Sequence, residues 1–190
     1  MTRPLCPPHR RISRPVLALM TATGLILIAA STVSRQKVVL WNATSSVPRG
    51  LYMVSREISL DPGTLLVVHL PEPVAHLASK RGYLPTDIPL IKPVAAGPEA
   101  AVCRHGDTIF VNGKARGVAK AVDLKGRPLP VWQGCHRLRN DEVFLMNSQN
   151  PDSFDGRYFG PIPTQNILGT AHPLLTEEPS LAPAAFPTHR

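Results

Sequence analysis

Aromatic residues make up only 5% of this 190-residue chain, and cysteine occurs only three times. So few aromatic side chains, together with 21 prolines and 13 glycines, disfavour a helical bundle and favour a body of short strands and loops. The His-Glu-x-x-His motif of zinc proteases is also missing. The length suits one domain with its own core plus a short appendage.

Acidic residues are missing from the first 56 positions, which hold eight of the 21 lysines and arginines. Residues 57–190 carry 13 basic and 13 acidic side chains, so the formal charge of +8 belongs to one end of the chain. That larger part has no run of basic residues interleaved with aromatics. We therefore expect no nucleic-acid partner.

Charged residues are also missing from residues 15–33, a mainly apolar stretch long enough to cross the hydrocarbon core of a bilayer. The basic residues that flank it are Arg3, Arg10, Arg11, Arg14, Arg35 and Lys37. Because basic residues favour the cytoplasmic side, residues 1–14 are predicted to be a cytoplasmic tail, and 15–33 a transmembrane anchor. The lipid bilayer is thus an expected partner.

A cleavable secretory signal is the alternative for 15–33, since Ala29, Ala30 and Ser31 offer small residues where a cleavage site could lie. The length of the span favours an uncleaved anchor, but either interpretation exports the rest of the chain. A buried helix of a soluble protein fits the flanking charges least.

Cysteine usage agrees with export. Cys6 falls in the predicted cytoplasmic tail, which leaves Cys103 and Cys135 as one pair in the exported body. A disulfide between them would close a loop of about 30 residues and stabilise the fold by about 3 kcal/mol. Two free buried thiols are the alternative, which geometry must decide. Without further Cys or His partners nearby, a metal site is not expected, nor is a cofactor.

Residues 38–174 are predicted to form the exported domain, which we expect to be mainly antiparallel β. An Asn-Gly pair at 112–113 favours a tight hairpin after 108–111, and 72–80 could form a short helix. Residues 175–190, rich in Pro and Ala towards the end, are predicted to be a flexible tail. The strand candidates are 50–54, 64–70, 88–94, 108–111, 142–146 and 167–171.

Three segments carry the candidate chemistry. The first places Thr44, Ser45 and Ser46 just before Pro48, which taken alone indicates only a turn. The second embeds Lys92 in an apolar strand. Such lysines usually extend to water, but one that cannot do so has a lowered pKa and can act as a general base. A serine hydroxyl needs such a base to become a nucleophile.

The third segment, residues 147–163, is a polar loop leading into a strand and contains Ser153, Asp155 and Arg157. In this order the three segments resemble the signal peptidase I superfamily (peptidase family S26), most closely its conjugative-transfer TraF-type branch. Residues 46–52 match Ser-x-Pro-x-Gly-Leu-Tyr, and residues 92–96 match Lys-x-Val-Ala-Ala. Residues 153–163 match Ser-x-Asp-x-Arg-Tyr-Phe-Gly-Pro-Ile-Pro, the most specific of the three.

This resemblance implies a signal-peptidase-like β fold and a Ser–Lys dyad, with Ser46 as nucleophile and Lys92 as general base. Ser153 would orient the lysine amine, and Asp155 and Arg157 would support it. Thr44 would help to form the oxyanion hole. The chain departs from the general pattern at Pro93, where Arg is usual, at residues 97–99, where a Gly-Asp is replaced, and at Gly156, where Ser is common.

The function that the resemblance implies is a serine endopeptidase of the bacterial inner membrane, with its catalytic domain in the periplasm. Its substrate would be a membrane-tethered precursor with small side chains before the scissile bond, such as a pilin precursor for conjugative transfer, sometimes with cyclisation of the product. The alternatives are a general signal peptidase I and a non-catalytic pilus-assembly component with the same fold. The exported histidines lie in no recognisable triad setting: His69, His76, His105, His136, His172 and His189.

Overall fold

The computed structural model describes residues 13–33 and 37–177. The chain divides into two units, residues 1–36 and 37–190. In the first unit, helix α1 spans Arg14–Val33, so the helical part of the prediction for 15–33 is confirmed. Within the described ranges, however, no helix combines the length and the apolar character needed to cross a membrane. Most of the predicted tails, 1–12 and 178–190, lies outside the described residues.

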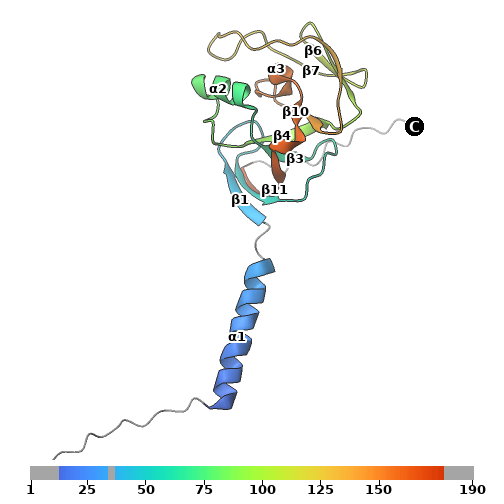
Figure 1. Ribbon diagram of the computed structural model, residues 1–190. Coiled ribbons are helices and arrows are strands. Elements are labelled where there is room, and N and C mark those ends of the chain that lie inside the picture. The colour runs from blue at the N-terminus through green and yellow to red at the C-terminus, as the bar shows by residue number, and fades with distance from the viewer. Residues whose placement is uncertain (1–12, 34–36, 178–190) are drawn as a thin grey trace, which may run out of the picture. The chain divides into compact units, whose positions relative to one another are not determined.

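The second unit is built on two antiparallel sheets (Figure 1). The larger sheet has the strand order β1-β2-β11-β3-β4-β9-β10, and the smaller has the order β7-β6-β5-β8. Every strand pair is antiparallel, which confirms the predicted mainly antiparallel β class. In the larger sheet the strands are β1 (Lys37–Asn42), β2 (Gly50–Ser55), β3 (Leu65–Val68), β4 (Leu90–Ala96), β9 (Glu142–Leu145), β10 (Ile162–Pro163) and β11 (Ile167–Thr176).

The smaller sheet contains the predicted hairpin. Its strands are β5 (Ala101–His105), β6 (Thr108–Val111), β7 (Lys114–Val118) and β8 (Gly134–Arg137). The turn between β6 and β7 has positive φ at Asn112 (49°) and Gly113 (75°), as an Asn-Gly turn requires. In Figure 1 this hairpin lies at the end of the body opposite β1.

Short helices complete the body. Helix α2 (Glu72–Lys80) forms where the sequence predicts it, between β3 and β4, and buries Ala75 and Ala78. A four-residue helix, α3 (Gly156–Phe159), follows the polar loop of the third segment, and a 3₁₀ turn spans Thr164–Asn166 before β11.

The C-terminal boundary of the domain differs from the predicted residue 174. Strand β11 continues to Thr176, because its last residues pair with β2, Leu175 opposite Leu51 and Thr176 opposite Gly50. The Glu177 amide then donates to the carbonyl oxygen of Arg49 at 2.9 Å. Residues 175–177 are therefore part of the folded domain and not of a tail.

Candidate active site

Lys92 sits on the apolar face of β4. Its neighbours on that face, Leu90 and Val94, belong to the main core cluster, as does its cross-strand partner Leu66 on β3. Side chains alternate between the two faces of a strand, so Ile91 points into a different cluster while Lys92 points into this one. The lysine is fully buried, with 0% of its surface exposed, and cannot extend to water.

This burial lowers the pKa of Lys92 from 10.5 to about 8, since removal from water disfavours the ammonium form. The nearby Asp155 carboxylate opposes the shift and Arg157 adds to it. Lys92 Nζ donates a hydrogen bond of 2.5 Å to Oγ of Ser153, which is itself only 2% exposed. A lysine held in this way is able to exchange a proton near neutral pH.

Asp155 and Arg157 form a buried ion pair beside Ser153. The distance from Arg157 Nη2 to Asp155 Oδ2 is 2.9 Å, and Asp155 Oδ1 accepts from Arg157 Nε at 2.9 Å. Burial alone would lower the pKa of Arg157, but the Asp155 carboxylate raises it above its ordinary value and keeps the guanidinium charged. Arg157 also donates to the backbone carbonyl oxygens of Asn147, Asn150 and Ser153, and so shapes the whole loop.

The local sequence explains why the third segment turns where it does. Asp155 caps the N-terminus of α3, accepting from the Arg157 amide at 3.2 Å. Gly156 then has no room for a side chain, because a Cβ there would lie 2.7 Å from the Leu145 carbonyl oxygen. This contact accounts for glycine at a position where the related pattern commonly has serine.

Ser46 lies in the loop that joins β1 to β2, where its side chain is half-buried. Asn42 organises this loop, since its amide donates to the carbonyl oxygens of Thr44, Val47 and Pro48. Tyr52 also holds Pro48, by donating from its hydroxyl to the same carbonyl at 2.6 Å.

Gly50 completes the first segment. Its φ is +142°, and a Cβ there would lie 2.1 Å from the Leu175 carbonyl oxygen, so only glycine fits. The Ser-x-Pro-x-Gly-Leu-Tyr spacing is therefore what this tight connection requires.

Asn147 joins the Ser46 loop to the lysine network. Its Nδ2 donates to the Ser46 carbonyl oxygen at 2.6 Å, while its backbone amide donates to Asp155 Oδ2 at 3.1 Å. Asn150 adds a second link, from its Nδ2 to the Ser45 carbonyl oxygen at 2.9 Å. Sequence reasoning assigned no role to either asparagine, although both lie in the polar loop that it singled out.

The predicted site residues thus fall into two groups. Lys92, Ser153, Asp155 and Arg157 form one continuous network. Among the described residues no hydrogen bond joins Ser46 Oγ to Lys92 Nζ, so the dyad itself stays a prediction. Thr44 donates its hydroxyl to Asn42 Oδ1 at 2.7 Å, and its role in an oxyanion hole likewise stays a prediction.

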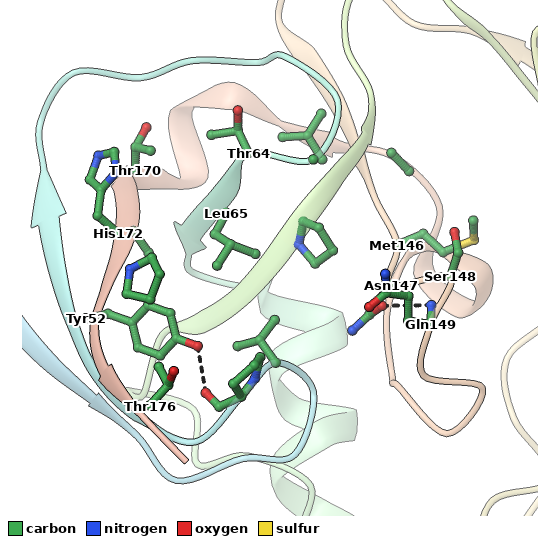
Figure 2. A pocket seen from close by; sticks show the side chains of 18 of the residues that line it. Tyr52, Thr64, Leu65, Met146, Asn147, Ser148, Gln149, Thr170, His172 and Thr176 are labelled. Carbon is green, nitrogen blue, oxygen red and sulfur yellow. Dashed lines mark hydrogen bonds between the residues drawn. The ribbon is translucent and has the colours of Figure 1, made fainter. Parts of the chain in front are cut away.

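Within the described part of the chain, three cavities adjoin the Ser46 loop. The largest, about 500 Å³, is shown in Figure 2 with Tyr52, Leu65 and His172 on one side and Met146 and Asn147 on the other. A second of about 420 Å³ has Ser46 and Asn147 in its lining, and a third of about 480 Å³ has Ser46 and Thr44. The candidate nucleophile is therefore open to a ligand from more than one side.

Cys103 and Cys135 form a disulfide, so the alternative of two free thiols is wrong. The two cysteines face each other across β5 and β8. His105 Nε2 lies 3.8 Å from Cys135 Sγ, but the sulfurs are bonded to each other and are not thiolates free to bind a metal.

The chain is similar to several known proteins. Residues 12–175 match the family model described as "Signal peptidase, peptidase S26". The chain is 33% identical to a plasmid transfer protein TraF of Escherichia coli, over 87% of this chain and 98% of that protein. It is 31% identical to a conjugal transfer protein TraF of Agrobacterium fabrum, over 87% of this chain and 98% of that protein. A crystal structure of a signal peptidase I from Enterococcus faecalis superposes with a TM-score of 0.36 at 19% identity, covering 61% of this chain and 98% of that one.

Proposed function

Because the chain belongs to the signal peptidase family S26, we propose that it is a serine endopeptidase in which Ser46 is the nucleophile and Lys92 the general base. The observation that carries the proposal is the buried Lys92, with a pKa lowered to about 8 and a hydrogen bond to Ser153. A merely structural lysine would gain nothing from a site that disfavours its charged form. The link from this network through Asn147 to the Ser46 backbone gives further support.

In the proposed mechanism, neutral Lys92 accepts the proton of the Ser46 hydroxyl as Ser46 Oγ attacks the scissile carbonyl. Apo structures often hold such groups apart until the substrate binds, and Ser46 and Lys92 would come within hydrogen-bond reach at that stage. Ser153 and the Asp155–Arg157 pair are positioning residues, since they act through Lys92 and the loop and not on the substrate.

The oxyanion would accept from the Ser46 backbone amide and the Thr44 hydroxyl, which would have to turn from Asn42 to donate. The Lys92 ammonium then returns its proton to the leaving amine, which departs and leaves an ester on Ser46. Water attacks this ester as Lys92 takes one of its protons. The Lys92 ammonium then protonates Ser46 Oγ as the ester bond breaks, which releases the carboxylic acid product and restores both residues. A substrate amine attacking instead would give a cyclised product.

We propose a conjugative role, with a membrane-tethered pilin-like precursor as substrate. The proposal rests on two relatives whose names refer to plasmid or conjugal transfer, each covered over 98% of its length. A general signal peptidase I and a non-catalytic assembly component with the same fold are the competing functions. The buried network around Lys92 favours an enzyme over the second of these.

The proposed location is the bacterial inner membrane, with the N-terminus cytoplasmic and the catalytic domain periplasmic. It rests on the arginines that precede the uncharged stretch 15–33, and the Cys103–Cys135 disulfide supports an oxidising compartment. Alkaline extraction of membranes tests it: release of the full-length chain into the soluble fraction would overturn the anchor. A shortened soluble chain would favour the cleaved signal.

The function is tested by incubating the full-length protein with a pilin precursor from the same transfer region and, separately, with a general secretory precursor. Ser46→Ala and Lys92→Ala should each abolish cleavage of the pilin precursor, while Ser45→Ala should retain it. Cleavage surviving in the first two variants would overturn the dyad. Preference for the general secretory precursor would overturn the conjugative role.

A further inference from the structure

The cavity of about 480 Å³ beside Ser46 is rich in positive charge. Among its described lining residues, basic side chains outnumber acidic ones by five to two. Residues 57–190 as a whole balance their charges, whereas the lining residues from that range include four basic and two acidic side chains, so the cavity has a local excess of positive charge. The charged residues are Arg49, Arg81, Lys120, Lys125 and Arg127, with Asp123 and Asp152.

The two acidic residues of the lining are already paired with other side chains. Asp152 pairs with Lys120. Asp123 accepts from Arg127 Nε at 2.7 Å and from the Tyr83 hydroxyl. It also accepts from the backbone amides of Lys125 and Arg127, each at 2.9 Å. Burial tends to raise the pKa of Asp123, but these hydrogen bonds hold it well below its ordinary value, so its charge is present and used within the loop.

Three cations of the cavity therefore face it without a carboxylate. Within the described part of the chain, no ion pair involves Arg49, Arg81 or Lys125. Among the described residues, the Arg81 side chain makes one long hydrogen bond, of 3.5 Å from Nη1 to the Tyr83 hydroxyl. A cluster of like charges in a concave site raises the local concentration of an anionic ligand.

Much of the remaining lining is apolar. Leu70, Ala78, Leu84 and Leu90 are all buried and come from the main core cluster. Ser45 and Ser46 line the same cavity. An apolar lining, unpaired cations and a candidate nucleophile in one cavity fit a peptide that has small or apolar residues near its scissile bond and an acidic side chain close by.

We propose that this cavity binds an acidic side chain that flanks the bond cleaved at Ser46, so that Arg81 and Lys125 set a substrate preference for Asp or Glu near that bond. The inference rests on the proposed function, whose substrate class it narrows.

Binding is measured with full-length Ser46→Ala, which cannot form an ester, so that recognition is separated from cleavage. The probes are two fluorescent peptides with the same Ala-rich centre, flanked on both sides by Asp in one and by Asn in the other. We expect tighter binding of the Asp peptide, and this preference should fall as salt is raised, because exposed charges are screened.

The cations are tested by Arg81→Gln and Lys125→Gln in the same background. Each should reduce the preference for Asp over Asn by up to about fivefold, the range of an exposed ion pair. Lys114→Gln is a matched control, since Lys114 also adjoins a turn glycine, is also exposed, and does not line the cavity. Arg56→Gln is the control for Arg81, since it also removes an arginine but at an exposed position that does not line the cavity.

Equal binding of the two peptides, or a preference unchanged in both cavity variants, would overturn the inference. The inference would also be overturned if Arg81→Gln and Lys125→Gln lost binding to phosphatidylglycerol vesicles but kept the preference for the Asp peptide. The cavity would then bind lipid phosphate. With intact Ser46, equal cleavage of both peptides would overturn the inference alone. Selective binding without any cleavage would overturn the proposed function alone.

Discussion

The Lys92 amine and the Ser153 hydroxyl, 61 positions apart in the chain, are joined by a hydrogen bond of 2.5 Å inside the core. Lys92 is carried by β4 among apolar neighbours, and Ser153 by the loop that Arg157 holds in place. The core supplies the desolvation that lowers the pKa of Lys92, and the loop supplies the oxygen that fixes its position. Both effects depend on tertiary packing.

Activity should rise with pH through the pKa of Lys92. A general base must be neutral, and with a pKa of about 8 only about a tenth of the lysine is neutral at pH 7. The ratio kcat/KM should therefore increase about tenfold from pH 7 to a plateau above pH 9, which a quenched-peptide assay would measure. Lys92→Arg should be inactive throughout, because a guanidinium does not lose its proton in this range. A flat profile between pH 6 and 9 would contradict Lys92 as the base.

The same pKa predicts how stability depends on pH. The folded state releases the Lys92 proton at about pH 8, whereas the unfolded chain holds it to 10.5, so stability should rise with pH between these values. A shift of this size corresponds to roughly 3 kcal/mol. Below pH 8 Lys92 is protonated in both the folded and the unfolded state, so the folded state carries the full free-energy cost of burying its charge.

Comparison with Lys92→Met isolates this effect, because other titrating groups are common to both proteins. The difference in unfolding free energy between wild type and variant, from urea titrations, should change by roughly 3 kcal/mol in favour of wild type between pH 8 and 10.5. A difference that is constant over this range would mean that Lys92 titrates normally in the folded state.

The sequence was sufficient for most strands with strong apolar patterns, and β1, with the sequence Lys-Val-Val-Leu-Trp-Asn, is the exception. Each of the six predicted strands overlaps an observed one, and 108–111 coincides with β6. The strands outside the list of candidates are β1, β5, β8 and β10, together with β7, which only the Asn-Gly hairpin signal implied. They are short, mixed or exposed. The residues of β8, for example, are Gly-Cys-His-Arg and all are exposed. Such strands form because a neighbouring strand offers unpaired backbone groups, and the residue pattern of the strand itself does not indicate this pairing.

The candidate site was predictable to a similar degree. Lys92, Ser153, Asp155 and Arg157 were found through a family pattern, and the structure brings them together. Asn147 was not found, because its importance depends on reaching the Ser46 carbonyl, 101 positions away. An asparagine in a polar loop is ordinary by sequence, and only the folded arrangement distinguishes it.

Asn147→Ala should impair catalysis more than folding. It removes the 2.6 Å hydrogen bond to the Ser46 carbonyl, at a cost of about 1 kcal/mol in stability. The loosened loop should lower kcat by about tenfold to a hundredfold, because even a small displacement of the nucleophile slows the reaction strongly. Asn150→Ala frees the Ser45 carbonyl and the Asp152 amide but leaves the Ser46 carbonyl bound, so it should have the smaller effect on kcat. Equal losses in the two variants would argue against positioning of Ser46 by Asn147.

Breaking the Asp155–Arg157 pair should destabilise the fold strongly. Arg157→Met leaves a buried carboxylate without its partner and frees four loop carbonyls, for an expected loss of about 3–5 kcal/mol. Arg137→Met is the control, since its pair with Glu99 is exposed and should contribute at most about 1 kcal/mol. Urea denaturation of both variants gives the comparison, and similar losses would show that burial adds nothing to the Asp155–Arg157 pair.

Gly156 should not tolerate a side chain. A Cβ at this position would lie 2.7 Å from both the Leu145 carbonyl oxygen and a ring carbon of Phe144, and the backbone oxygen cannot move without disturbing β9. Gly156→Ala should therefore lower the free energy of unfolding by about 1–3 kcal/mol. Because α3 begins at this residue, the displacement would also move Ser153 relative to Lys92 and reduce kcat.

Gly117→Ala provides the matched control for this steric effect. A Cβ at residue 117 would meet only the Met146 side chain, at 3.5 Å, which is an ordinary contact with a flexible group. Its unfolding free energy should stay within about 0.5 kcal/mol of wild type. If Gly156→Ala changed the free energy of unfolding as little as Gly117→Ala, the close approach of α3 to β9 would not constrain residue 156. Glycine in place of the serine common in related chains would then have no steric cause.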